Sequence, residues 1–331
     1  MLSLVIPVYR NEENLDRLLL ELCGLRERLA EELEVVFVVD GSPDRCLEIL
    51  QQKLPTMPLR SRLVSLSRNF GSFSAVLAGL NEGRGDYFAV LAADLQEPPE
   101  LVLQFHEVLR SKSADIVFGF RTKRSDPWFS ELTSTLFWLI YRKLVVKEMP
   151  KGGVDVFACS KEVRDHVLRF REVNTNLIAL LFWLGFRRHY IGYERASRRE
   201  GKSAWTLGKK LQYCLNSIFN FTDLPIRLLL VTGTLGTMIA VVAGFVVLLA
   251  RLRGEVPVPG YTVIVLAVLF FGGLITLGLG ILGQYLWLSL QNVRSRPNYL
   301  IAESEVYGQP SEWNADAAAH GARRRAQGDS Y

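Results

Sequence analysis

Hydrophobic and polar positions follow two different patterns along this chain, and the first covers roughly its N-terminal 120 residues. Short apolar runs rich in Val, Ile, Leu and Phe alternate there with longer segments of helical periodicity. Short apolar runs bounded by polar residues are typical of buried strands. The runs that predict strands are Leu2–Ile6, Glu34–Val39, Arg62–Leu66, Tyr87–Ala92 and Asp115–Phe118.

Helical segments are predicted between these strands. The segment Asn11–Ala30 carries leucines at helical spacing and acidic residues in its first turn, and both features favour an amphipathic helix. Phe73–Leu80 and Pro98–Arg110 are two further helices, the second opening on Pro-Pro-Glu as helices often do. Because strands alternate with helices, the sequence predicts an α/β fold with a mostly parallel, doubly wound sheet.

The second pattern lies near the C-terminus, where two long stretches contain no charged residue. They cover residues 228–250 and 261–290. A helix needs about 20 apolar residues to cross the hydrocarbon core of a bilayer, so both stretches are predicted to be transmembrane helices. Together they predict a two-helix hairpin that anchors a large preceding domain to one face of a membrane.

Charged residues predict how this hairpin is oriented. Lys209, Lys210 and Arg227 precede it and Arg294 and Arg296 follow it, whereas the connecting loop holds only Arg251 and Arg253. The positive-inside rule then places the large domain and the tail in the cytoplasm. We therefore predict a multi-pass protein of the inner (plasma) membrane.

The predicted organisation has six parts. It consists of a cytoplasmic α/β domain at 1–205, a juxtamembrane amphipathic helix at 206–227, transmembrane helices at 228–250 and 261–290 around an extracytoplasmic loop at 251–260, and a largely disordered cytoplasmic tail at 291–331. Residues 129–146 and 206–224 mix apolar, aromatic and basic residues. They are either ordinary core helices or helices that lie in the membrane interface.

Composition narrows the classes of partner. The net charge is +5 and the sequence pI is about 9.0, with basic residues concentrated in 187–210 just ahead of the hairpin. No recognition helix or zinc-finger spacing accompanies them, which argues against nucleic acid and favours lipid headgroups or a phosphorylated ligand. The four cysteines have no metal-like spacing, so we expect reduced thiols.

Polar residues follow each of the five predicted strands. Parallel sheets bind ligands at the carboxyl ends of their strands, where these residues would line one edge. Such a set of carboxylates, amides and arginines suits a metal-bound polyanionic ligand. The residues after the strands are Tyr9-Arg-Asn-Glu-Glu13, Asp40-Gly-Ser-Pro-Asp44, Ser67-Arg-Asn-Phe-Gly71, Asp94-Leu-Gln-Glu97 and Gly119-Phe-Arg121.

At these strand ends the chain resembles the inverting, membrane-associated family 2 glycosyltransferases that charge polyprenyl phosphates, such as dolichol-phosphate mannose synthase and the bactoprenol glucosyltransferases. The likeness covers roughly residues 1–225, with six segments in the family's order, and the C-terminal hairpin matches the bactoprenol branch. The six segments are Ile6-Pro-Val-Tyr-Arg-Asn-Glu-Glu-Asn14, Val39-Asp-Gly-Ser-Pro-Asp44, Ser67-Arg-Asn-Phe-Gly71, Ala93-Asp-Leu-Gln-Glu-Pro-Pro-Glu100, Gly119-Phe-Arg121 and Arg195-Ala-Ser-Arg-Arg-Glu-Gly-Lys-Ser203.

The resemblance implies a GT-A fold with interfacial helices, a nucleotide-sugar donor, a divalent cation (Mg²⁺ or Mn²⁺), a polyprenyl-phosphate acceptor and a homo-oligomer, in related proteins a tetramer. It also assigns roles. By resemblance, Pro7, Tyr9, Glu13, Asp40 and Asp94 bind the nucleotide sugar, Asp94 and Gln96 hold the metal, Arg121, Ser134 and Arg198 hold the lipid phosphate, and Asp155 lies near the attacking oxygen.

The sequence departs from the family's pattern at three places. Val39 and Ala92 stand where the family often has acids, and Phe157 stands where many members carry Arg. One metal carboxylate fewer should weaken cation binding. This leaves open a catalytically impaired protein that only binds nucleotide sugars.

The function predicted first is transfer of a hexose to polyprenyl phosphate with inversion, for a cell-envelope glycan or glycolipid. Glucose from UDP-glucose is the first expectation for the donor and mannose from GDP-mannose is the second. A processive polysaccharide synthase is disfavoured because the chain lacks a Gln-x-x-Arg-Trp motif and further spans. A tethered transferase that acts on soluble acceptors is the remaining enzyme alternative.

Overall fold

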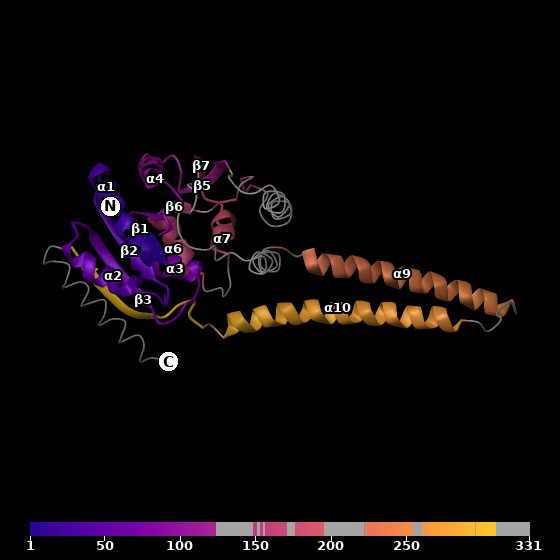
Figure 1. The fold of residues 1–331 in the computed structure, drawn as a ribbon. Coiled ribbons are helices and arrows are strands. Elements are labelled where there is room, and N and C mark those ends of the chain that lie inside the picture. The colour runs from indigo at the N-terminus through magenta and orange to yellow at the C-terminus, as the bar shows by residue number, and fades with distance from the viewer. Residues whose placement is uncertain are drawn as a thin grey trace.

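The structure is a computed structural model of the 331-residue chain. It describes residues 1–123, 148–150, 153–154, 156–170, 176–194, 222, 224–253, 260–294 and 296–308. An α/β domain built around one sheet carries two long helices, which extend away from it on one side (Figure 1).

The sheet has eight strands in the order β7-β5-β6-β4-β1-β2-β3-β8. Only β6 and β8 run against the others, so the sheet is mostly parallel, as the alternating pattern predicts. The strands are β1 Leu2–Val8, β2 Leu33–Val39, β3 Arg60–Leu66, β4 Tyr87–Val90, β5 Ile116–Lys123, β6 Val156–Ser160, β7 Arg188–Glu194 and β8 Ile301–Tyr307.

Helices cover both faces of this sheet, because successive side chains of a strand point to opposite faces and both sets are apolar here. Leu4 and Ile6 of β1 pack in a core with α1, α2 and α4, whereas Val5 packs in a second core with α3, α6 and α7. The helices are α1 Leu15–Arg28, α2 Cys46–Lys53, α3 Ser72–Glu82, α4 Glu100–Arg110, α6 Lys161–Arg169 and α7 Leu177–Trp183, with 3-10 turns at Glu12–Asn14 and Leu54–Thr56.

The predicted strands and helices of the first 120 residues are confirmed, with shifted ends. The strand predicted at Leu2–Ile6 continues to Val8, and the one predicted at Asp115–Phe118 continues to Lys123. The helix predicted from Asn11 begins as a 3-10 turn and becomes α-helical at Leu15. Residues 129–146 and almost all of 206–224 lie outside the described residues.

The prediction of a disordered tail is wrong for its first part. Ile301–Tyr307 forms β8, which pairs antiparallel with β3 and closes that edge of the sheet (Figure 1). Ser67 N–H donates to Leu300 O at 3.0 Å and extends the pairing. The strand is stabilised by backbone hydrogen bonds to a segment about 240 residues earlier, and such bonds require no apolar periodicity. Composition therefore did not reveal it.

The two long helices are α9 Leu224–Leu252 and α10 Tyr261–Val293, which lie side by side (Figure 1). A Cβ on Gly278 would lie 3.3 Å from Leu229, and Tyr285 Oη donates to Thr222 O at 3.4 Å. Within the described residues, Phe270–Gln291 is the one segment long and apolar enough to cross a membrane, and α9 contributes a shorter apolar stretch, Pro225–Gly236. A helical hairpin is therefore present, and whether it makes two spans stays a prediction.

Candidate functional site

The carboxyl ends of β1 and β2 lie next to each other. Val8 pairs with Val39, and Asp40 N–H donates to Val8 O at 3.0 Å. The loops that begin at Tyr9 and Asp40 therefore leave the sheet side by side. This arrangement brings two of the predicted nucleotide-sugar segments to one place.

Pro7 marks where β4 separates from β1. Alternate residues of a strand bond to opposite neighbours: Val8 bonds to β2, and Val5 O accepts from Leu91 N–H at 3.1 Å on the β4 side. Pro7 has no N–H, and its position faces the β4 side, where β4 has ended at Val90. The proline lacks the N–H that would continue the ladder on this side, so the pairing of β1 with β4 ends at the carboxyl edge.

The loop after β1 is strained and carries the other predicted residues. Arg10 has a φ of 54°, a left-handed conformation that costs a non-glycine residue about 1–2 kcal/mol. The Arg10 guanidinium lies 5.4 Å from the ring centroid of the half-buried Tyr9. The backbone N–H of Arg10 donates to Ser42 Oγ at 2.8 Å. Glu13 is exposed in the 3-10 turn that follows.

Asp40 joins the loop after β2 to the loop after β3. Its carboxylate is 2% exposed and accepts hydrogen bonds from the backbone N–H groups of Phe70 at 2.7 Å and Gly71 at 2.8 Å. Burial raises the pKa of Asp40, and these two N–H donors oppose the shift. Asp40 therefore holds the segment that leads into α3. Its predicted contact with a nucleotide stays a prediction.

Gly41 allows the same two loops to approach closely. Its φ is +55°, and a Cβ built there would lie 2.3 Å from the carbonyl carbon of Arg68. A side chain at this position would thus collide with backbone in a conformation that disfavours it. The Asp-Gly pair that ends β2 is required by packing as well as by turn geometry.

A second carboxylate network joins the loops after β1 and β2. Asp44 accepts from Ser42 Oγ at 2.5 Å, from Glu12 N–H at 3.3 Å and from Cys46 N–H at 3.4 Å. Burial acts to raise the pKa of Asp44, but these donors outweigh it and lower the pKa. Sequence reasoning missed this role, although an Asp two residues before a helix is a recognisable capping signal.

Asp94 lies in a tight turn after β4. Leu95 has a φ of 52°, its N–H donates to Ala92 O at 3.5 Å, and Gln96 N–H donates to Asp94 Oδ1 at 3.4 Å. Asp94 is half-buried and Gln96 is 7% exposed. Left-handed non-glycine residues cluster at functional sites, because the surrounding fold must compensate for their strain. The turn is thus the second strained segment at this edge.

The donors at this turn suit a hard divalent cation that is completed by a ligand. Among the described residues, no group of three or more His, Cys, Asp or Glu side chains could hold a metal. Mg²⁺ is usually bound through one or two carboxylates together with substrate phosphates and water. Asp94 can supply one carboxylate of that kind, so the residues present fit such an ion.

The remaining predicted residues are only partly described. Arg121 is half-buried near the carboxyl end of β5, opposite Tyr193 of β7. Ser134, Asp155 and Arg198 lie outside the described residues, so the predicted acceptor set is not assembled by the structure.

Two observations at this edge add detail to the sequence prediction. Val39, one of the departures from the family pattern, is 2% exposed in the core beside α1 and α2, so this position points into apolar packing. Arg68 is exposed, and its guanidinium lies 4.4 Å from the ring centroid of Phe70. With Arg10 it adds positive charge to the edge that carries Asp40 and Asp94.

The mostly parallel α/β domain, with its polar carboxyl edge, is a GT-A-like fold. The chain belongs to glycosyl transferase family 2, whose model matches residues 3–177. It is thus a glycosyltransferase, as the strand-end motifs indicated.

The proteins that the chain resembles include two bacterial transferases and one enzyme of known structure. It is 30% identical to the SfII prophage-derived bactoprenol glucosyl transferase of Shigella flexneri, covering 92% of this chain and 98% of that protein. It is 31% identical to the undecaprenyl-phosphate 4-deoxy-4-formamido-L-arabinose transferase of Edwardsiella ictaluri, covering 94% and 96%. Glucosyl-3-phosphoglycerate synthase from Mycobacterium tuberculosis is 17% identical with a TM-score of 0.48, covering 66% and 79%.

Proposed function

We propose that this protein transfers a hexose from a nucleotide sugar to polyprenyl phosphate at a membrane surface, with inversion at the anomeric carbon. The observation that carries the proposal is the carboxyl edge of the sheet. The Asp40 clamp, in which the Asp40 carboxylate binds the N–H groups of Phe70 and Gly71, follows β2, and the strained Asp94–Gln96 turn follows β4, on the other side of β1. Named relatives similar over more than nine-tenths of the chain act on bactoprenol or undecaprenyl phosphate.

The chemistry requires positioning more than activation. A phosphate monoester has a second pKa near 6, so the acceptor oxygen is largely deprotonated at neutral pH. That oxygen attacks the anomeric carbon while the bond to the nucleoside diphosphate breaks on the opposite side. Asp155, predicted to lie near the attack, would then orient the sugar or the acceptor rather than remove a proton. Catalysis would come from alignment and from stabilisation of the leaving diphosphate.

The predicted polar residues each have a part in this scheme. Tyr9 and Glu13 would contact the nucleotide beside the clamp formed by Asp40. Arg121, together with Ser134 and Arg198, would hold the acceptor phosphate, which the donor fork of an arginine fits well. Asp94 and Gln96 would hold Mg²⁺ or Mn²⁺, which when bound supplies positive charge to the departing diphosphate.

The helical hairpin supports a membrane location for this reaction. Most of the large apolar side chains of α10 that the structure describes are exposed, as a lipid-facing helix requires. We propose that α9 and α10 both span an inner membrane and hold the catalytic domain in the cytoplasm. We also propose a homo-oligomer in which helices of different subunits approach each other most closely at the glycines of α10.

Glucose from UDP-glucose is the donor we propose first, because one similar protein is named a bactoprenol glucosyl transferase. The test uses the full chain in nanodiscs with undecaprenyl phosphate, Mg²⁺ or Mn²⁺ and a panel of nucleotide sugars, including GDP-mannose. Mass spectrometry should detect one lipid-linked hexose, and its mass and donor dependence would identify the sugar class.

The opposite result would favour the alternative of a non-catalytic protein. If the chain binds nucleoside diphosphates but yields no lipid-linked sugar with any donor, the transfer proposal is wrong. The alanine at position 92 would then be the first position to change, with Ala92→Asp as the variant that restores an acid to the turn.

A further inference from the structure

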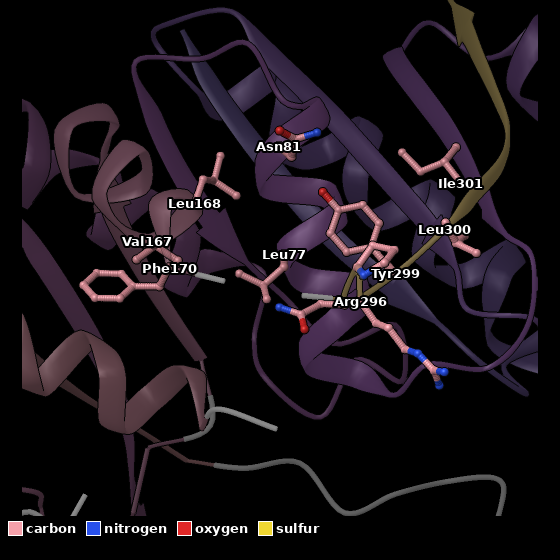
Figure 2. A pocket seen from close by; sticks show the side chains of 11 residues that line it. Leu77, Asn81, Val167, Leu168, Phe170, Arg296, Tyr299, Leu300 and Ile301 are labelled. Atoms are coloured by element: carbon pink, nitrogen blue, oxygen red, sulfur yellow. The ribbon is translucent and has the colours of Figure 1, made fainter. Parts of the chain in front are cut away.

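A cavity lies where the chain returns from α10 to the sheet. Its volume is about 470 Å³, within the range of small-molecule sites. It is formed by α3, by the end of α6 and by residues 296–301, which connect α10 to β8. Figure 2 shows Val167, Leu168 and Phe170 on one side of this cavity and Tyr299 facing them across Leu77.

The chemistry of this cavity is that of an amphipathic ligand. Leu77, Leu168 and Phe170 provide apolar walls, and Asn81 and Arg296 provide polar groups. Arg296 is exposed, and its guanidinium extends away from the apolar side chains in Figure 2. The described residues that line the cavity include no Asp or Glu. A ligand with an apolar chain and a negatively charged head would match these walls and this charge.

The position of the cavity indicates where such a ligand comes from. Arg296 follows the end of α10 by three residues, and Phe270–Gln291 of α10 can span a bilayer. Aromatic side chains are enriched at membrane–water interfaces. Trp183 is 66% exposed, and its ring lies 5.6 Å from that of Phe170. The cavity is therefore lined by the segment that directly follows the apolar helix α10 in the chain.

We propose that this cavity binds one anionic diacyl phospholipid of the surrounding bilayer. Its phosphate would lie at Arg296, and an acyl chain would lie between Leu168, Phe170 and Tyr299. The inference rests on the membrane location in the proposed function. It describes a site separate from sugar transfer, because no cavity residue belongs to the loops that carry Tyr9, Asp40 or Asp94. The bound lipid would fix the connection between α10 and β8, and with it the height of the catalytic domain above the bilayer.

The test measures lipid retention by the full chain without any donor sugar. The chain is released from nanodiscs of equal phosphatidylglycerol and phosphatidylcholine and examined by native mass spectrometry. We expect one retained phosphatidylglycerol per chain. Arg296→Gln should lower its retention about fivefold, the factor for one basic residue near an anionic surface. Leu168→Trp should abolish retention by filling the cavity.

Matched controls lie on α1, outside the cavity. Arg17→Gln removes the same charge from a half-exposed side chain, and Leu20→Trp adds the same volume to a side chain that is 71% exposed. Both should retain the lipid as the unchanged chain does. Because a variant of Leu168 can misfold, Leu300→Glu places a charge at a side chain that is 53% exposed and should also abolish retention.

Two results would overturn the inference. One is that Arg296→Gln, Leu168→Trp and Leu300→Glu all retain phosphatidylglycerol as well as the unchanged chain does. The other is displacement of the phospholipid by one equivalent of undecaprenyl phosphate, which would make the cavity an acceptor site. Sugar transfer that persists without lipid retention would reject this inference alone. Lipid retention without sugar transfer would reject the proposed function alone.

Discussion

At the amino edge of the sheet, charged side chains pair with one another. Glu31 lies 3.1 Å from the N-terminal ammonium of Met1, 3.3 Å from His106 and 3.4 Å from Arg110, and Asp115 makes a two-pronged pair with Arg187. At the carboxyl edge, Asp40 and Asp44 instead accept hydrogen bonds from backbone N–H groups of neighbouring loops. These carboxylates differ in their main partners, which are charged groups at the amino edge and backbone N–H groups at the carboxyl edge, although Glu12 also lies 3.7 Å from Arg45 there.

This difference separates structural charges from candidate functional ones. At the amino edge an ion pair joins the start of one strand to the start of another, and each charge has its partner within the domain. At the carboxyl edge the carboxylates shape loops, and two of the three left-handed non-glycine residues among the described residues, Arg10 and Leu95, occur in those same loops; the third, Lys112, lies between α4 and β5. Strain is retained where the fold positions a group for a purpose other than stability. Charge density alone would not have distinguished the two edges.

Replacing one aspartate at each edge gives the largest expected contrast. Asp94→Ala should lower turnover by about 10²–10³-fold, because a charge that stabilises the leaving diphosphate is lost. Asp86→Ala, at a side chain that is 67% exposed and pairs with the Met1 ammonium, should leave turnover near wild type. Initial rates at saturating Mg²⁺ measure both. Wild-type turnover in Asp94→Ala would remove the functional assignment of the carboxyl edge.

Two glycines sharpen the comparison by stability. Gly41→Ala and Gly85→Ala each force a Cβ against backbone, at 2.3 Å from the Arg68 carbonyl carbon and 2.7 Å from Ser3 N. Each should lower the free energy of unfolding by about 1–3 kcal/mol. Only Gly41→Ala should also weaken binding of the nucleoside diphosphate, because it moves loops at the carboxyl edge. Thermal unfolding with and without the diphosphate tests this, and equal loss of binding in both variants would contradict it.

The Asp40 clamp should show a smaller effect on stability. Asp40→Ala leaves the N–H groups of Phe70 and Gly71 without their acceptor, and because both residues are half-buried, where water can replace part of the lost bonding, the cost should be about 1 kcal/mol. Asp40→Asn keeps one carbonyl acceptor and should fall between alanine and wild type. Thermal unfolding ranks the three chains. If alanine and asparagine are equally stable, the clamp does not depend on hydrogen-bond acceptance.

The smallest effect is expected for the Asp115–Arg187 pair, and it should depend on pH. The hydrogen bonds from Arg187 lower the pKa of Asp115 below the usual aspartate value of about 3.9. The folded protein therefore gains stability above that value, and the gain is lost as pH falls below it through the lowered folded pKa. Asp115→Asn should reduce the acid sensitivity of the melting temperature between about pH 5 and 3 without changing turnover. An unchanged acid profile would contradict the pairing.

The sequence by itself determined the parallel sheet, its main helices and the edge that carries the candidate site. Strands and helices follow from periodic apolar positions, which are local properties, and every parallel strand presents its carboxyl end at the same edge. The candidate site residues at the strand ends could therefore be chosen from the sequence alone; they include Tyr9, Asp40, Asp94 and Arg121. The long apolar stretches 228–250 and 261–290 predicted the helical hairpin in the same way.

The tertiary structure alone decided which partners those residues meet. Asp40 binds N–H groups 30 residues away, and β8 pairs with a strand about 240 residues earlier. Hydrogen bonds between distant backbone segments leave no periodic trace in a sequence, because any residue except proline can donate them. The cavity between α3, α6 and residues 296–301 arises for the same reason: it is formed by the packing of elements that are local only in three dimensions.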